Sequence, residues 1–342
     1  MSEQTPFISV AIASYNYEQY IGRMLDSVAA QTFRDYEIVI TDDGSTDGAL
    51  SVIRAFIEAH PELTIFLYEN NHQGLAANRN SSLDHARGKY ITFCDADDYL
   101  EPDCLEVLAE QAAATDADRI VSYVRDVDPS GREMQIEEQW GTIKSRWMCN
   151  LHHGCLYKRE VFLRYGIRFT EAAGGDDFCI SSIYNSYAES AAFVEKPLYN
   201  WVVHADSTAG AKKEITSYAG LNMIRQIVEP MKEIRERLKD REEDLNLFLY
   251  QLIRFYYFCI FHSYRYVPLK QTFRDYTEMR KLIRGIEPNY LKNRYIHLKK
   301  ESPVRVYAQR IIFGCAWAEK LHLMKPALAL YHLVSKFHYF NV

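Results

Sequence analysis

The first 125 residues of the chain alternate short apolar runs of strand length with longer segments whose apolar residues recur at helical spacing. Strands that are apolar throughout and separated by helices are typical of a parallel sheet covered on both faces. The pattern therefore predicts an α/β, Rossmann-like fold with a mostly parallel sheet flanked by helices. The predicted strands are Phe7–Ser14, Tyr36–Thr41, Leu63–Tyr68, Lys89–Cys94 and Arg119–Val124. The predicted helices are Glu18–Gln31, Gly48–His60, Gly74–Ala86 and Pro102–Ala114.

The remainder of the chain follows a different pattern. It is irregular from about residue 126 and nearly all helical from Glu214 onwards, with Tyr218–Leu238 and Asp244–Tyr264 as the clearest helices. We therefore predict a domain of residues 1–213, with parts 1–125 and 126–213, followed by a helical C-terminal region of residues 214–342. The start of the chain lacks the pattern of an export signal, and no apolar run approaches the roughly 20 residues that span a bilayer. We expect a cytoplasmic protein with reduced thiols.

Charge is divided unevenly between the two parts. Residues 1–210 contain 16 Lys and Arg against 33 Asp and Glu, a net −17, whereas residues 211–342 contain 24 against 13, a net +11. The acidic part suits a divalent metal ion, and the basic, aromatic-rich segment 215–342 suits an anionic membrane surface. The alternative for the aromatic residues is that they form the core of the helical region. Nucleic acid is not expected as a partner, because the acidic part would repel it and no binding motif is present.

Two polar loops follow predicted strands, Thr41–Asp47 and Asp95–Asp98. In open α/β sheets, ligands bind outside the carboxyl ends of the strands, where both loops are expected to lie. Clustered carboxylates on a tight turn suit Mg²⁺ or Mn²⁺, which leave coordination positions for phosphate oxygens. The alternative is that these side chains only cap helices, with Asp98 serving the helix that begins near Pro102.

An ordered set of motifs makes the chain resemble a known family. The set is Ala13-Ser14-Tyr15-Asn16, Gln31-Thr32-Phe33, Asp42-Asp43-Gly44-Ser45-Thr46-Asp47, Asn78-Arg79-Asn80, Gly88-Lys89-Tyr90-Ile91 and Asp95-Ala96-Asp97-Asp98. Over residues 6–210 it resembles glycosyltransferase family 2, whose members have the GT-A fold. The resemblance implies inverting transfer from a nucleotide-sugar.

The resemblance also implies roles for individual residues at the donor site. Tyr15 packs on the base, Asp42 bonds it, Asp95 lies near the ribose, and Asp97 binds a Mn²⁺ or Mg²⁺ ion that bridges the diphosphate. Arg79 either approaches the nucleotide or forms a salt bridge that holds the aspartate loops. The predicted donor site is completed by Ala13, Asp43 and Ala96.

The predicted general base comes from Gly175-Asp176-Asp177-Phe178. The family has a Glu-Asp pair at this place, so the resemblance assigns the base to Asp177, with Asp176 in place of the glutamate. A base on the acceptor side deprotonates the attacking hydroxyl opposite the leaving diphosphate. The alternative is that one of the two aspartates caps a helix that runs to about Tyr187, and we expect one to cap and the other to catalyse.

Two further segments contain candidate ligands. His204 lies in a segment similar to the one that closes over the donor, and some family members use a histidine there as a metal ligand; the alternative is a surface loop histidine. Cys149–Cys155 suggests zinc at first sight, but the cysteine spacing is wrong and no second pair follows. We expect this segment on the acceptor side, with Trp147 or His153 against the sugar.

The sequence thus favours an inverting hexosyltransferase that moves a sugar, most simply from a UDP-sugar, to a glycan or a lipid-linked saccharide at the inner face of the membrane. A nucleotidyltransferase would need a basic, glycine-rich phosphate loop where this chain has Ala13–Tyr17. A non-catalytic nucleotide-sugar-binding scaffold remains as the alternative, although Asp97 and Asp177 are both present. Homo-oligomerisation is left open.

Overall fold

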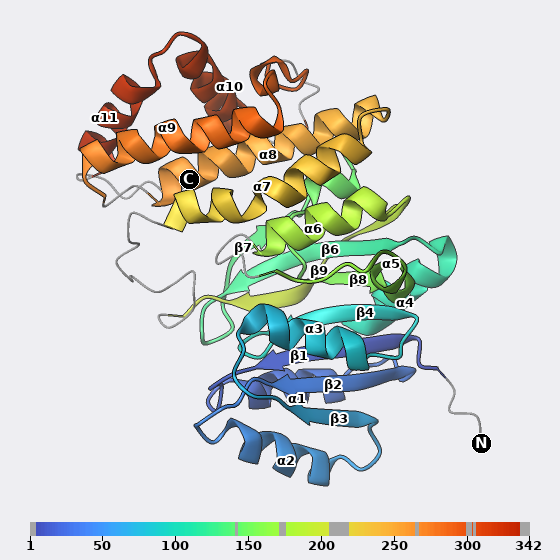
Figure 1. Cartoon of the computed structure of the whole chain (residues 1–342). Coiled ribbons are helices and arrows are strands. Elements are labelled where there is room, and N and C mark those ends of the chain that lie inside the picture. The colour runs from blue at the N-terminus through green and yellow to red at the C-terminus, as the bar shows by residue number, and fades with distance from the viewer. Residues whose placement is uncertain are drawn as a thin grey trace. The chain divides into compact units, whose positions relative to one another are not determined.

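The chain folds into two compact units in the computed structural model (Figure 1). The first unit comprises residues 1–139, 149–171 and 187–211, and the second comprises residues 140–148, 172–186 and 212–342. The sequence-based boundary at residue 213 stays a prediction. The structure describes residues 5–140, 143–170, 176–204, 219–263, 267–298, 303 and 306–335.

The first unit is built on one mixed sheet with the strand order β3-β2-β1-β4-β8-β6-β9-β5 and with β7 paired to β6. Strands β3, β2, β1 and β4 are all parallel, β8 is antiparallel to both neighbours, and β9 is parallel to β6. The predicted α/β class is therefore confirmed. The strands are β1 Ile8–Ser14, β2 Tyr36–Asp42, β3 Ile65–Glu69, β4 Tyr90–Asp95, β5 Tyr99–Leu100, β6 Arg119–Val127, β7 Glu133–Glu137, β8 Cys155–Lys158 and β9 Ala191–Val202.

Helices cover both faces of the parallel half. Right-handed crossovers step outward from β1 to β3 through α1 and α2, and α3 then leads back to β4, so α3 covers the opposite face and packs on β1 and β2 (Figure 1). Four apolar side chains of α1 are buried at helical spacing, and each stabilises the fold by about 1.5–3 kcal/mol relative to exposure. The helices of this unit are α1 Ile21–Ala29, α2 Ala49–Ala59, α3 Leu75–His85, α4 Cys104–Thr115 and α5 Arg159–Tyr165.

The second unit is helical, and α7 contacts both α8 and α9. Among the described residues, no helix combines the length and the apolar character needed to cross a membrane. The helices of the second unit are α6 Asp176–Tyr187, α7 Ala219–Arg237, α8 Glu242–Ser263, α9 Leu269–Ile286, α10 Val306–Lys320 and α11 Met324–Ser335, with short 3₁₀ turns η1 Arg146–Met148 and η2 Tyr290–Lys292.

A buried carboxylate organises the aromatic core of the second unit. The side chain of Glu319 is wholly buried and accepts hydrogen bonds from four tyrosine hydroxyls at 2.6–3.1 Å. The donors are Tyr256 and Tyr257 of α8, Tyr276 of α9 and Tyr290 of η2. Much of the aromatic excess thus lies in the core, which was the alternative to a membrane surface, while Phe258 and Trp317 are about half exposed.

Candidate active site

The register of the parallel strands brings the two polar loops to one edge of the sheet. Ser14 at the end of β1 pairs with Asp42 at the end of β2, and Ala13 pairs with Asp95 at the end of β4. Ala13 and Ala96 are both buried beside these strand ends. The carboxyl edge of β1, β2 and β4 therefore carries the predicted donor residues of the first unit.

Asp42 shapes the loop that follows β2. Its Oδ1 accepts the Ser45 backbone N–H at 2.8 Å, and its Oδ2 accepts the Ser45 hydroxyl at 2.6 Å. The same loop is tied to the loop after β1, because Asn16 Oδ1 accepts the Thr46 N–H at 2.8 Å. Asn16 has a φ of 56°, in the left-handed region that asparagine tolerates better than most residues. The loops after β1 and β2 are thus bonded to each other at this edge of the sheet.

Asp43 accepts hydrogen bonds from the turn that leads into α3. Its two oxygens accept the backbone N–H groups of Gln73 at 2.8 Å and Gly74 at 2.9 Å, and His72 lies 2.8 Å away. Gly74 has a φ of 96°, which favours glycine at this turn. Because both oxygens bond the backbone, the geometry gives Asp43 a structural role beside the predicted donor role.

Tyr15 stands at the same edge with 38% of its surface exposed. Its ring stacks on that of His72 at a centroid distance of 4.3 Å and an angle of 21°. Sequence reasoning missed His72. The signal was present in the polar stretch Asn70–Gly74, which is the loop that follows the third predicted strand.

Asp95 is held between the side chains of Arg79 and His153. Arg79, only 4% exposed, donates to Asp95 Oδ1 at 2.7 Å, and His153 Nε2 lies 3.0 Å from Oδ2. Burial alone would raise the pKa of Asp95, but Arg79 and then His153 outweigh it and hold the pKa well below its usual range. Arg79 therefore forms the salt bridge that was one of its two predicted roles, and His153 lies against the acids.

Asp97 and His204 meet although 107 residues separate them in sequence. His204 Nε2 lies 3.0 Å from Asp97 Oδ2, and the imidazole stacks on Tyr20 at 4.6 Å. Burial raises the pKa of Asp97, and the nearby charge of Asp95 raises it further. Arg23 donates to the backbone carbonyl of Asp97 at 2.8 Å and so fixes the turn.

Asp98 accepts hydrogen bonds from a strand of the sheet and does not cap α4. It is fully buried, and its oxygens accept the Tyr199 hydroxyl at 2.6 Å and the Val202 N–H at 2.8 Å, both from β9. Helix α4 begins at Cys104, after Asp103. The capping alternative for Asp98 is therefore wrong, because the turn after β4 directs this side chain into the sheet.

These acids fit a hard divalent cation. Asp95, Asp97 and Asp98 each offer an oxygen, and the three ligand atoms lie within 4.8 Å of one another. Asp98 accepts a bond at each oxygen, and Asp95 has Arg79 and His153 at its two oxygens. Asp97, whose Oδ2 lies beside His204, is therefore the most available ligand of the three. A cation beside Asp97 would offset the repulsion from Asp95 that raises its pKa. Carboxylate oxygens suit Mg²⁺ or Mn²⁺, and the imidazoles of His153 and His204 lie beside them.

The segment Cys149–Cys155 packs around a buried arginine. Arg119 donates to the backbone carbonyls of Cys149 at 3.1 Å and Leu151 at 2.6 Å, and to the sulfur of Cys155 at 3.5 Å. Trp147 is buried in the second unit and donates from Nε1 to Asp244 at 2.7 Å. These contacts indicate packing roles for Trp147 and for the two cysteines.

Asp176 and Asp177 are the first two residues of α6, in the second unit. A helix N-terminus favours negative charge, because its first N–H groups lack partners within the helix. That location suits a capping carboxylate and equally suits a carboxylate kept ionised as a base. Their assignment as cap and base stays a prediction.

Comparison with known proteins shows which family part of the chain resembles. Residues 9–167 match the family model described as glycosyl transferase family 2. The putative glycosyltransferase EpsH of Bacillus subtilis (strain 168) is 27% identical over 261 residues, which cover 72% of this chain and 75% of that protein.

Two solved structures share the GT-A fold with this chain at 18% identity, and at that identity the likeness concerns the fold alone. S. aureus TarS 1-349 in complex with UDP-GlcNAc aligns with 98% of this chain and 94% of that chain, with a TM-score of 0.71. The mannosyltransferase PcManGT from Pyrobaculum calidifontis, in complex with GDP-Man and Mn²⁺, aligns with 98% and 88%, with a TM-score of 0.52. Residues 9–167 of the chain are thus similar to glycosyltransferase family 2, and this stretch contains Asp42, Arg79, Asp95 and Asp97 of the candidate site.

Proposed function

We propose that this protein is an inverting glycosyltransferase that transfers a hexosyl group from a UDP-sugar to a hydroxyl of a glycan or a lipid-linked saccharide. The observation that carries the proposal is the cluster of Asp95, Asp97 and Asp98 at the carboxyl edge of the sheet, beside Asp42 and Tyr15. To bind a nucleoside diphosphate, a site needs an aromatic ring that stacks on the base, an acceptor for the hydrogen-bond donors of the base, and a cation that neutralises the diphosphate. The GT-A structures in complex with UDP-GlcNAc and with GDP-Man and Mn²⁺ support this reading.

In this proposal, different side chains bind different parts of the donor. The exposed ring of Tyr15, backed by His72, offers a stacking face for the base. Asp42 is buried and bonded by Ser45 at each oxygen, so it would accept from the base with a second lone pair. Arg79 keeps Asp95 ionised near the ribose. Asp97 and His204 would hold Mn²⁺ or Mg²⁺, which when bound supplies charge stabilisation for the leaving diphosphate. Asp177 takes the proton of the acceptor hydroxyl as the new bond forms at the anomeric carbon.

A panel of nucleotide-sugars tests the donor class. The chain is incubated with each nucleotide-sugar and Mn²⁺, and the released nucleotide is measured. We expect release from a UDP-sugar, with slower or no release from GDP- and ADP-sugars. A non-catalytic scaffold would bind a nucleotide-sugar in a titration but release no nucleotide from any donor, and that result would reject the enzyme.

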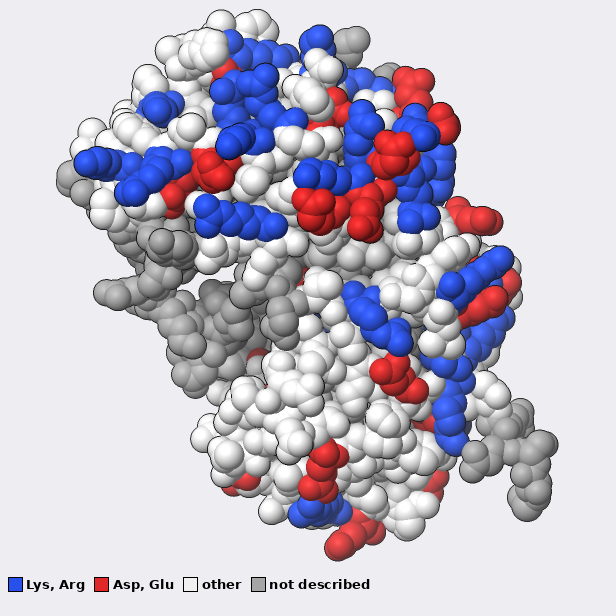
Figure 2. Space-filling view, in the orientation of Figure 1, with Lys and Arg blue, Asp and Glu red and all other residues white. Residues whose placement is uncertain are grey.

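We also propose that the C-terminal region places the enzyme at the inner face of the membrane. Lys and Arg side chains gather over the C-terminal helices (Figure 2), and residues 211–342 carry a net +11. Exposed apolar side chains on α10, on α11 and between them add to this surface, namely Trp317, Leu321, Leu323, Leu330 and Leu333. Basic residues near an anionic leaflet contribute about 1 kcal/mol each to binding.

Vesicle flotation tests the membrane proposal. We expect the chain to float with vesicles that contain anionic lipid at low salt, to be released as salt screens the charges, and to lose binding when residues 215–342 are removed. Absence of flotation at low salt would reject membrane association and leave acceptor binding or oligomerisation as the role of the region.

A further inference from the structure

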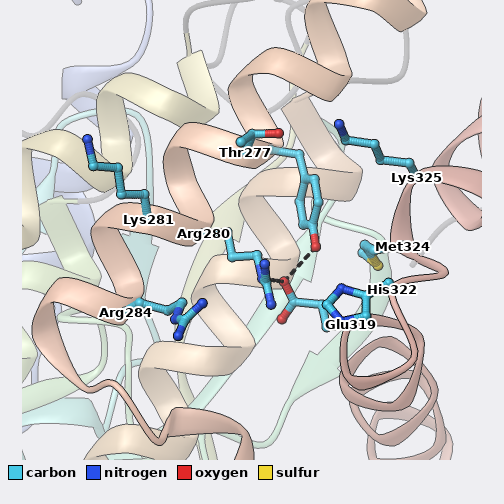
Figure 3. A pocket seen from close by; sticks show the side chains of 9 residues that line it. Thr277, Arg280, Lys281, Arg284, Glu319, His322, Met324 and Lys325 are labelled. Carbon is cyan, nitrogen blue, oxygen red and sulfur yellow. Dashed lines mark hydrogen bonds and ion pairs between the residues drawn. The ribbon is translucent and has the colours of Figure 1, made fainter.

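A cavity of about 530 Å³ lies within the second unit, between α9 and the turn that joins α10 to α11. Figure 3 shows Arg280 of α9 facing Glu319 of α10, with Arg284 one turn further along α9 and Lys325 entering from α11. Four of the nine lining residues are Lys or Arg, and Glu319 is the only acid among them. The volume is in the range of small-molecule sites.

Glu319 forms a fixed floor for this cavity and neutralises one cation. Its carboxylate accepts the four tyrosine hydroxyls described above, and Arg280 Nε lies 3.3 Å from Oε1. A wholly buried charge must be held by such partners to be tolerated. The charges of Glu319 and Arg280 therefore offset each other, and Arg280 is fixed with about a quarter of its side chain still accessible.

The other three cations of the cavity keep their charge unneutralised. Within the described parts of the chain, Lys281, Arg284 and Lys325 form no ion pair with a carboxylate, and all three are exposed. Surface cations usually have mixed-sign neighbours, so three such charges around one hollow make a local positive field.

The turn between α10 and α11 fixes the far wall. His322 has a φ of 60°, an uncommon backbone conformation for a residue other than glycine, and its N–H donates to the Glu319 carbonyl at 3.1 Å. Uncommon conformations persist where the surrounding structure holds them and are frequent at ligand sites. The turn brings the His322 side chain and Lys325 into the lining, opposite Arg284 (Figure 3).

We infer that this cavity binds a phosphate or diphosphate group, carried either by a soluble molecule or by a lipid. Guanidinium groups match phosphate oxygens with paired hydrogen bonds, and lysine adds point charge. A ligand of charge −2 to −3 would balance Lys281, Arg284 and Lys325, whereas a single carboxylate would leave two of them uncompensated. The site is additional to the donor site, and its existence does not depend on the proposed reaction.

Titration of the full chain with pyrophosphate in a chelator-containing buffer tests this site, with heat of binding as the readout. Arg284→Gln with Lys325→Gln is expected to weaken binding at least about tenfold, because each lost bond to a charged group is a strong one. The matched control is Lys270→Gln with Arg274→Gln, which removes the same charge from α9 outside the cavity lining. Asp97→Asn is expected to leave pyrophosphate binding unchanged.

Three results would overturn the inference: no binding to the wild-type chain, equal weakening in the control pair, or loss of binding in Asp97→Asn alone. Vesicles of phosphatidylcholine with and without phosphatidic acid separate the two sources. A lipid ligand requires vesicle binding that pyrophosphate displaces and that Arg284→Gln with Lys325→Gln loses. Pyrophosphate binding that vesicles do not compete with identifies a soluble ligand. Nucleotide release by the same variants is expected to be unchanged, so failure here is distinguishable from failure of the proposed function.

Discussion

Asp97→Asn is expected to lower nucleotide release from the donor by about 10²–10³-fold, because it removes the charge that holds the cation against the leaving diphosphate. The fold should survive the change. Burial and Asp95 raise the pKa of Asp97, so the folded state already disfavours its ionised form. A neutral side chain of the same shape therefore removes no stability that depends on charge at neutral pH.

Manganese binding measured by electron paramagnetic resonance and the melting temperature complete this experiment. Wild type should bind Mn²⁺, Asp97→Asn should not, and both should melt at similar temperatures. Asp84→Asn is the control, since Asp84 is about half exposed and pairs with Arg168 on the surface. Full activity of the wild type in excess chelator would contradict a metal-dependent mechanism, whatever the variant does.

Strands β1, β2 and β4 of the parallel half were predictable because they are buried on both faces. Strand β1 is Ile8–Ser14 against a predicted Phe7–Ser14, and all seven of its residues are buried. Strand β9, Ala191–Val202, was not predicted. It contains Glu195, Lys196 and Pro197, and its pairing with β6 shifts register there, so neither a continuous apolar run nor an alternation marks it. Strand β7 is mostly exposed, and its Met134 and Ile136 alternate with polar residues over only five positions.

The acids of the site show what a motif predicts and what it omits. The run Asp95-Ala96-Asp97-Asp98 indicated a carboxylate cluster, but the three aspartates differ by partners that come from distant segments. Asp95 contacts Arg79 and His153, whereas both oxygens of Asp98 accept hydrogen bonds from β9. The Asp97–His204 pair was anticipated only through the family resemblance, since spacing alone cannot pair residues 107 positions apart.

The assignment of the general base makes the second large prediction. Asp177→Asn is expected to lower kcat by about 10²–10⁴-fold with little change in the KM for the donor, because a base acts chiefly in the transition state. The readout is nucleotide release under saturating donor, followed over a range of acceptor concentrations. Donor affinity, measured separately by titration with the nucleotide, should match that of the wild type.

Asp176→Asn is the matched control, because both aspartates begin α6 and both changes remove one charge from the same helix terminus. Asn can replace Asp as a cap, so this change removes only a negative charge at the helix N-terminus, about 0.3–1 kcal/mol, whereas loss of a base costs turnover. We therefore expect a similar small fall in melting temperature in both variants, with kcat largely kept in Asp176→Asn and lowered in Asp177→Asn. If the kinetic loss appears in Asp176→Asn, the base is one residue earlier. If neither variant loses turnover, the base lies outside α6, and the match to the Glu-Asp pair of the family is wrong.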